Sequence, residues 1–228
     1  MKNRPFAICH MMMSVDGRID CAMTEQLGDE DAYYNSLASL KCATTLMGRT
    51  TMEMHYTDGT HFVAVDPTPI GMEDFRINRE SDDYTISLDS HGTLNITTAE
   101  VDDQPLLVVV SEDAPAEYVA KLDSLGISWI ATGKGRVDLV RMAEILADNF
   151  GIERMAVVGG ATVNGAMLAA GLIDEVSVIV GAGIDGRHGQ KGLFDGMSEV
   201  GWSVQSLRLH GVARVGEQAV WLRYDVIK

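Results

Sequence analysis

The sequence predicts a single α/β domain in three layers, with helices on both faces of a mainly parallel, mixed sheet. Three observations predict this class. Apolar runs of strand length alternate with segments of helical periodicity along the 228 residues. Glycine or proline stands at most of the junctions. The last part of the chain alternates polar and apolar residues around a turn, which predicts an antiparallel C-terminal hairpin.

The predicted parallel strands are short apolar runs bounded by turn residues. They are expected over residues 6–13, 44–47, 84–88, 106–110, 127–131, 154–158 and 175–180. The hairpin is expected over residues 202–226, with its turn at Val215-Gly216-Glu217. Strands that alternate with helices favour parallel pairing, because each helix returns the chain to the same edge of the sheet.

The predicted helices lie between these strands. Residues 29–40 place Tyr33, Leu37 and Leu40 on one face, and a second helix begins after Gly48. A third covers residues 115–125, with Gly126 where the chain leaves it. Asp138 caps a fourth, whose apolar residues recur at helical spacing, and residues 162–170 form a fifth.

Residues 56–83 interrupt this alternation. Gly59, Pro67, Pro69 and Gly71 punctuate the segment, which predicts an irregular conformation. The α/β pattern resumes behind it, so the segment is interpreted as an insertion or lid within one domain, residues 1–228, and not as a linker.

Composition excludes several classes of function. The net charge of −15 argues against binding to nucleic acid or to an anionic membrane. No apolar stretch has the length of a membrane span, and no signal-peptide core follows the N-terminus. The three cysteines, Cys9, Cys21 and Cys42, show no paired or metal-binding spacing and are expected to be free thiols. The sequence therefore predicts a soluble, cytoplasmic protein.

Three junctions carry groups suited to phosphate. Gly159 and Gly160 end an apolar strand where a helix begins, so backbone N–H groups are open to a ligand; the alternative is a tight turn that binds nothing. Gly48-Arg49-Thr50-Thr51 offers a guanidinium and two hydroxyls, although Arg49 alone would also suit a surface helix cap. Ser90 follows a third strand. Such sheets bind ligands beyond the carboxyl ends of their strands, so these junctions together suit NADPH.

Four runs in order resemble the riboflavin-biosynthesis reductase family, which comprises the reductase half of the bifunctional deaminase-reductase and the archaeal diaminopyrimidinone reductases. The runs are Ser14-Val15-Asp16-Gly17-Arg18-Ile19, Leu46-Met47-Gly48-Arg49-Thr50-Thr51, Val157-Val158-Gly159-Gly160 and Gly171-Leu172-Ile173-Asp174-Glu175-Val176. Gly133-Lys134-Gly135-Arg136-Val137-Asp138-Leu139 is also similar to the archaeal members. The run from Met47 to Glu53 resembles dihydrofolate reductase, whose fold this family shares.

The resemblance implies a dihydrofolate-reductase-like fold, a homodimer, and hydride transfer from NADPH to a pyrimidine that carries a ribosyl phosphate. Thr51, Ser90 and the residues from Gly160 onward are implied to line the cofactor, with Met12 or Met13 beside the nicotinamide. Together with the junctions, the expected cofactor-binding residues are Met12, Met13, Gly48, Arg49, Thr51, Ser90, Gly159, Gly160, Ala161, Thr162, Val163 and Asn164.

Three residues are candidates on the substrate side. Asp16 follows the first strand and is the catalytic candidate; alternatively it is a turn-former ahead of Gly17. Lys41 stands where the family tends to place a substrate-contacting arginine; alternatively it is a cation that complements the C-terminus of a helix. Val158 replaces the glutamate that the family usually has before the glycine pair.

A second departure concerns the substrate phosphate. The family's acidic-acidic-proline run and its following arginine are missing, and His55, Tyr56, Thr57 and Asp58 occupy that region. Two other functions therefore stay open: reduction of a pterin, dihydrofolate-like or other small heterocyclic imine, and NADP binding without catalysis. Neither an H-x-E nor a P-C-x-x-C signature occurs, so deamination and a metal site are not expected.

Overall fold

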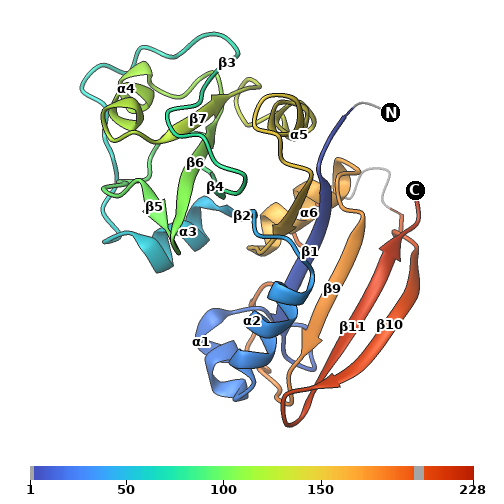
Figure 1. The fold of residues 1–228 in the computed structure, drawn as a ribbon. Helices are drawn as coiled ribbons and strands as arrows, with labels where there is room; N and C mark the ends of the chain where they lie inside the picture. Colours follow the sequence, from blue (N-terminus) through green and yellow to red (C-terminus); the bar gives the residue numbers. More distant parts are fainter. Residues whose placement is uncertain (1–2, 198–202) are drawn as a thin grey trace. The chain divides into compact units, whose positions relative to one another are not determined.

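The computed structural model describes residues 3–197 and 203–228, which group into two compact units (Figure 1). The central unit consists of Ala43–Glu153 and residues 3–5. The terminal unit consists of Phe6–Cys42 and the described residues of Arg154–Lys228. The terminal unit is thus assembled from two stretches of chain separated by the whole central unit.

The strands of the terminal unit follow the order β10-β11-β9-β1-β8 (Figure 1). β1 (Phe6–Met13) is parallel to both of its neighbours, β8 (Arg154–Val157) and β9 (Glu175–Val180). β11 (Ala219–Val226) runs antiparallel to β9, and β10 (Leu207–Val215) runs antiparallel to β11. The predicted C-terminal hairpin is confirmed; Trp202, where the pattern places its start, lies outside the described residues.

The helices of the terminal unit are α1 (Cys21–Thr24), the 3₁₀ turn η1 (Glu25–Leu27), α2 (Glu30–Ser39) and α6 (Ala161–Ala169). Asp20 caps α1 by accepting a hydrogen bond from the Met23 amide at 3.1 Å. The sequence pattern does not predict α1 or η1, because one or two turns are too short to show a helical period.

One face of β1 packs against α2. Ile8 and Ala156 form a buried apolar cluster with Leu40 and Cys42. Further along β1, Met12 packs with Ile179 and Ala219, and Tyr33 closes this second cluster. The alternation along β1 therefore directs every second side chain toward the helix.

The central unit contains four parallel strands in the order β2-β4-β6-β7. They are β2 (Thr45–Gly48), β4 (Thr85–Leu88), β6 (Gln104–Val110) and β7 (Ser128–Ala131). β6 contains a continuous apolar run over Leu106–Val110, as expected for a strand with both faces covered. Leu107, Val108 and Val109 of β6 are accordingly inaccessible to solvent.

The helices of the central unit are α3 (Arg49–Tyr56), α4 (Ala116–Ser124) and α5 (Leu139–Asp148). The predicted cap of α5 is confirmed: Oδ1 of Asp138 accepts hydrogen bonds from the amides of Val140 and Arg141 at 3.1 and 3.0 Å. Gly126 has φ +72°, which lets the chain leave α4 as predicted.

The insertion over residues 56–83 is less irregular than predicted. It contains β3 (Asp74–Arg76), which pairs antiparallel with β7 and becomes an edge strand of the central unit. A carboxylate oxygen of Glu117 in α4 accepts hydrogen bonds from the amides of Val65 and Asp66, each at 2.8 Å. The insertion is therefore attached to the central unit both at Val65-Asp66 and along β3. β5 (Glu100–Val101), which pairs antiparallel with β6, is a further strand that the sequence pattern does not predict.

The mostly parallel strands and the antiparallel C-terminal hairpin confirm the predicted mixed α/β class. The longest helices in the described part of the chain have ten residues, and none of them meets the length and apolarity needed to cross a membrane. One reductase domain over residues 1–228 stays a prediction.

Candidate functional site

In the central unit, the predicted site residues lie at the carboxyl edge of adjacent strands. Gly48, the last residue of β2, is opposite Leu88, the last residue of β4. Arg49 and Thr51 therefore follow at the start of α3, while Ser90 follows β4 at the same edge. No side chain caps α3, so its first N–H groups are left for a ligand or solvent.

Neighbouring loops fix the position of Ser90. Its carbonyl accepts hydrogen bonds from the amide and the hydroxyl of Ser111, at 3.0 and 2.7 Å. Its hydroxyl oxygen accepts a long hydrogen bond of 3.4 Å from the amide of Val137. Ser90 is thus held between the end of β6 and the loop that contains Gly133 and Gly135.

Arg49 does not stand alone on α3. Its Nη1 donates a 2.7 Å hydrogen bond to Oε2 of Glu53, one helical turn further on. Oε1 of Glu53 in turn contacts Nε2 of His61, which belongs to the insertion. The guanidinium is nevertheless accessible, because its side chain is 38% exposed.

In the terminal unit, a second set of predicted residues lies at the carboxyl edge of β1 and β8. Met12 is buried and Met13 half-buried at the end of β1, and Gly159 follows the end of β8. Gly159 has φ +109°, and a Cβ there would lie 3.1 Å from the Cε atom of Met11. The positive φ is the reason that glycine is needed here, and Gly159 itself is buried in the structure. Gly160 then precedes α6 without a side-chain cap.

Residues 191–196, which we call the strap, lie along the first turns of α6. The amide of Asp195 donates to the Ala161 carbonyl at 3.1 Å, and Nδ2 of Asn164 donates to the Leu193 carbonyl at 2.9 Å. Nζ of Lys191 donates to the hydroxyl of Thr162 at 3.0 Å. A Cβ on Gly165 would lie only 2.1 Å from the Asp195 carbonyl oxygen, so close approach of the strap requires glycine. Val163 lies on the same turns, half-buried.

The strap brings a cation to the glycine-pair junction that sequence analysis misses. Among the described residues, no carboxylate forms an ion pair with Lys191, whereas Arg223 and Lys228 each pair with one and Arg187 pairs with two. The sequence signal was slight: Lys191 lies in a glycine-rich loop about 30 residues from Thr162, and no motif connects the two.

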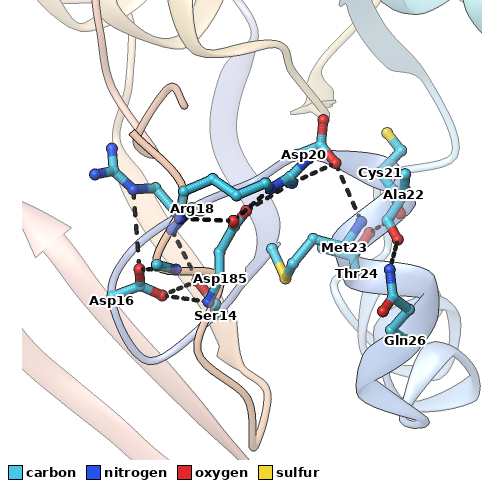
Figure 2. Close-up of polar contacts among 12 residues, drawn as sticks. Ser14, Asp16, Arg18, Asp20, Cys21, Ala22, Met23, Thr24, Gln26 and Asp185 are labelled. Atoms are coloured by element: carbon cyan, nitrogen blue, oxygen red, sulfur yellow. Dashed lines mark hydrogen bonds and ion pairs between the residues drawn. The ribbon is translucent and has the colours of Figure 1, made fainter. Parts of the chain in front are cut away.

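Asp16 joins two loops of the terminal unit (Figure 2). Its carboxylate accepts a 2.6 Å hydrogen bond from the Ser14 hydroxyl and 3.0 Å hydrogen bonds from the amides of Asp185 and Gly186. The Ser14 hydroxyl, followed by the two amides, lowers the pKa of Asp16 far below its usual value. Asp16 is therefore ionised at neutral pH and accepts hydrogen bonds without being able to donate one.

Arg18 and Arg187 strengthen the same connection (Figure 2). Arg18 donates to the carbonyl of Gln190, which precedes the strap, and forms a short antiparallel bridge with Gly192 of the strap. Arg187 pairs with Asp185 at 2.6 Å and with Asp20 at 2.9 Å. The loop after β1 thus helps to position the segment that carries Lys191.

Lys41 and Val158 are placed differently from the other predicted residues. The carbonyl of Leu40, next to Lys41, accepts a 3.3 Å hydrogen bond from Arg154, the first residue of β8. Lys41 therefore lies toward the amino edge of the parallel strands, away from Gly159. Val158 is half-buried and packs against the apolar cluster around Ile8. The position of Lys41 therefore favours the alternative role, that of a cation that complements the C-terminus of a helix.

These features define a class of protein. It is a mixed α/β protein in which helices with a glycine N-cap begin at the carboxyl edges of the strands, a geometry suited to a phosphorylated ligand. The RibD C-terminal domain family model matches residues 5–221, so this chain belongs to the RibD C-terminal domain family.

Two curated relatives carry the same name, 2,5-diamino-6-ribosylamino-4(3H)-pyrimidinone 5′-phosphate reductase. The protein of Methanothermobacter thermautotrophicus is 32% identical over 202 residues, which cover 85% of each chain. The protein of Archaeoglobus fulgidus is 25% identical over 234 residues, which cover 97% of this chain and 99% of the relative. The predicted family resemblance is confirmed, and with it the class of enzyme, a reductase.

Solved structures agree on the fold. A pyrimidine reductase-like protein of Corynebacterium diphtheriae superposes with a TM-score of 0.71 at 17% identity, covering 99% of this chain and 93% of that one. The riboflavin biosynthesis reductase of Saccharomyces cerevisiae gives a TM-score of 0.61 at 17% identity, with coverages of 98% and 90%. The dihydrofolate-reductase-like fold is thereby confirmed.

Proposed function

We propose that this chain reduces the ribosylamino-pyrimidinone phosphate named for its archaeal relatives, with NADPH as the hydride donor. The observation that carries the proposal is the likeness to those relatives over almost the whole chain, including 32% identity to one of them. The glycine-headed starts of α3 and α6 support it, because each leaves backbone N–H groups open to phosphate.

The residues present suit a phosphorylated nicotinamide cofactor. On α3, Arg49 offers a guanidinium for the 2′-phosphate, with Gly48, Thr51 and Ser90 at the same edge. On α6, the expected contacts are the backbone from Gly159 to Val163 and the Thr162 hydroxyl, and Lys191 adds an ammonium; the predicted contact Asn164 is inaccessible to solvent, with its Nδ2 bonded to Leu193. Met12 and Met13 would border the nicotinamide ring.

When bound, the cofactor supplies the hydride, so the protein has mainly to position the reactants. Asp16 contributes a permanent negative charge, since its pKa is lowered. Such a charge near the reacting C1′ would favour a protonated imine over the neutral form, because the carboxylate stabilises a cation. We assign Asp16 this electrostatic role and expect no proton transfer from it.

Val158 favours a second candidate among substrates. Its apolar side chain offers no hydrogen bond to an amino group, so a pterin, a dihydrofolate-like compound or another heterocyclic imine stays a candidate substrate. The purified chain should oxidise NADPH with the ribosylamino-pyrimidinone phosphate, followed by loss of reduced-nicotinamide absorbance. Turnover with dihydrofolate alone would select the second candidate. Binding of NADPH without turnover of either compound would indicate a cofactor-binding protein that lacks catalysis.

We also propose a cytoplasmic homodimer. Among the described residues, Cys9, Cys21 and Cys42 form no disulfide bond, which suits a reducing compartment. The edge strand β10 supports the dimer, because Leu209 and Val212 on it are 52% and 61% exposed. Their partners on β11 are Tyr224 and Leu222, so both apolar side chains lie on one face of the hairpin.

A further inference from the structure

The strongest unassigned cluster in the central unit surrounds Arg49. Glu53 lies one turn further along α3, and its two carboxylate oxygens have different partners. Oε2 accepts the 2.7 Å hydrogen bond from Arg49, while Oε1 contacts Nε2 of His61. The Glu53 side chain is only 18% exposed, so its charge is partly shielded from solvent.

We propose that Glu53 sets the selectivity of this chain between NADPH and NADH by competing with the 2′-phosphate for Arg49. The inference rests on the proposed function, in which Arg49 binds that phosphate. In this inference, Glu53 lowers the affinity for the phosphorylated cofactor. The insertion also affects the choice of cofactor, because His61 belongs to it.

The physical reason is the like charge of the two anions. A 2′-phosphate that reaches Arg49 must displace the Glu53 carboxylate or lie beside it, and either arrangement costs free energy. NADH carries a neutral hydroxyl at that position, which can donate a hydrogen bond to a carboxylate. Glu53 therefore reduces the difference in affinity by which Arg49 favours NADPH over NADH.

His61 limits the cost of displacement. If the phosphate takes Nη1 of Arg49, Oε2 of Glu53 loses its partner, but Oε1 keeps its contact with His61. A carboxylate left without any partner in a half-buried position would be much less favourable. His61 is accordingly a positioning residue that retains Glu53 when the phosphorylated cofactor binds.

The test compares dissociation constants of NADPH and NADH, measured by cofactor fluorescence, for the native chain, Glu53→Gln, His61→Ala and the double variant. Glu53→Gln keeps the shape of the side chain and removes its charge. Its NADPH dissociation constant should fall roughly 3- to 10-fold, the scale of a partly exposed charge pair, and the ratio of the NADH to the NADPH constant should rise. His61→Ala should weaken NADPH in the native background and have no effect once Glu53 is Gln.

Glu100→Gln is the matched control. Glu100 pairs with Arg79 on the exposed surface of the same unit, on β5, which adjoins the start of β6 and therefore the opposite edge of the strands. The Glu100→Gln variant loses the same single negative charge as Glu53→Gln. If it gains as much affinity for NADPH, the effect is due to net charge and the proposal is overturned. Thermal unfolding of each variant shows whether the fold is retained.

Two further outcomes separate this inference from the proposed function. If Arg49→Ala weakens NADPH but Glu53→Gln leaves the ratio unchanged, the role of Glu53 is refuted and the reductase assignment stands. If the native chain binds neither NADPH nor NADH, the proposed function is refuted, and the selectivity role is refuted with it.

Discussion

Lys41 occupies a backbone conformation that few lysines adopt. Its φ is +53°, directly after the C-terminal cap of α2, where helices commonly place glycine. A Cβ in this left-handed region costs about 1–2 kcal/mol, part of which glycine gives back as unfolded-state entropy. Lys41→Gly should therefore raise the free energy of unfolding by about 0.5–1 kcal/mol in urea denaturation.

The same variant distinguishes the two roles considered for Lys41. A helix C-terminal cation can be removed without changing the KM for substrate, which we expect from its place near Arg154. A large rise in KM would instead restore the substrate contact implied by the resemblance. Lys41→Ala serves as the control, since it removes the charge but keeps a Cβ and should bring no gain in stability.

For single residues, the sequence predicted the place of a residue in the fold better than it predicted the residues that its side chain contacts. Gly159 and Arg49 could be placed at strand ends because glycine marks such junctions locally, whereas the role of Ser90 was implied by the family resemblance alone. The strap could not be predicted, since Lys191 and Asp195 meet α6 only through tertiary contacts. The contacts of Asp16 with Asp185 and Gly186 could not be predicted either, because these residues lie 169 and 170 positions away in the sequence.

Among the described elements, β10 is open to a partner. It is an edge strand with two exposed apolar side chains on one face, in a hairpin that carries three arginines against two carboxylates. A second copy of a chain with net charge −15 meets the least repulsion there. Leu209→Lys should convert the proposed dimer into a monomer, since it would place a charge in an apolar interface.

Sedimentation equilibrium would report the change in mass. Val65→Lys is the control, because Val65 is 92% exposed in the insertion and lies outside β10. A native chain that already sediments as a monomer would refute the dimer. So would a Leu209→Lys variant that keeps the mass of two chains.

Longer elements were predictable where periodicity and caps agree, as in α5 with Asp138. β3 was not predictable, because its three residues, Asp74-Phe75-Arg76, become a strand only through pairing with β7. α1 could not be predicted either, because it has only four residues. Short elements depend on tertiary contacts that a local pattern does not contain.

For the molecule as a whole, a buried histidine makes stability depend on pH. His10 is inaccessible to solvent and stacks on Tyr33, with ring centroids 4.7 Å apart. Nδ1 lies 2.9 Å from the hydroxyl of Ser177, which also accepts a 2.7 Å hydrogen bond from Trp221. Nε2 lies 3.2 Å from the Tyr33 carbonyl. These partners suit a neutral ring that donates from Nε2 and accepts at Nδ1.

Burial is the main reason that the pKa of His10 is lowered to about 4, and the charge of Arg223 lowers it further. In the unfolded chain the ring takes up a proton near its ordinary pKa of 6.5, whereas the folded chain resists protonation until about 4. The free energy of unfolding should therefore fall as pH decreases from about 6.5 to 4, by about 1.4 kcal/mol per unit. Urea titrations at several pH values measure this slope.

His10→Asn is the control for that slope. Asparagine can occupy the site with two polar groups but does not titrate, so the variant should be less stable at neutral pH and show a flatter dependence between pH 6.5 and 4. The carboxylates with lowered pKa values, such as Asp225, lose their stabilising contribution only below that window. An unchanged slope in His10→Asn would assign the effect to other groups.

The division of the terminal unit between two distant stretches of chain has a consequence for biosynthesis. β1 leaves the ribosome first, yet both of its neighbours, β8 and β9, follow the whole central unit. The central unit, with its local parallel crossovers, can pair β2, β4, β6 and β7 with one another while β1 still lacks both of its neighbours. During that interval Ala7, Ile8 and Cys9, which are inaccessible in the finished fold, are exposed to solvent. Until the last third of residues 1–228 has been translated, this short apolar strand therefore has neither of its partner strands to cover it.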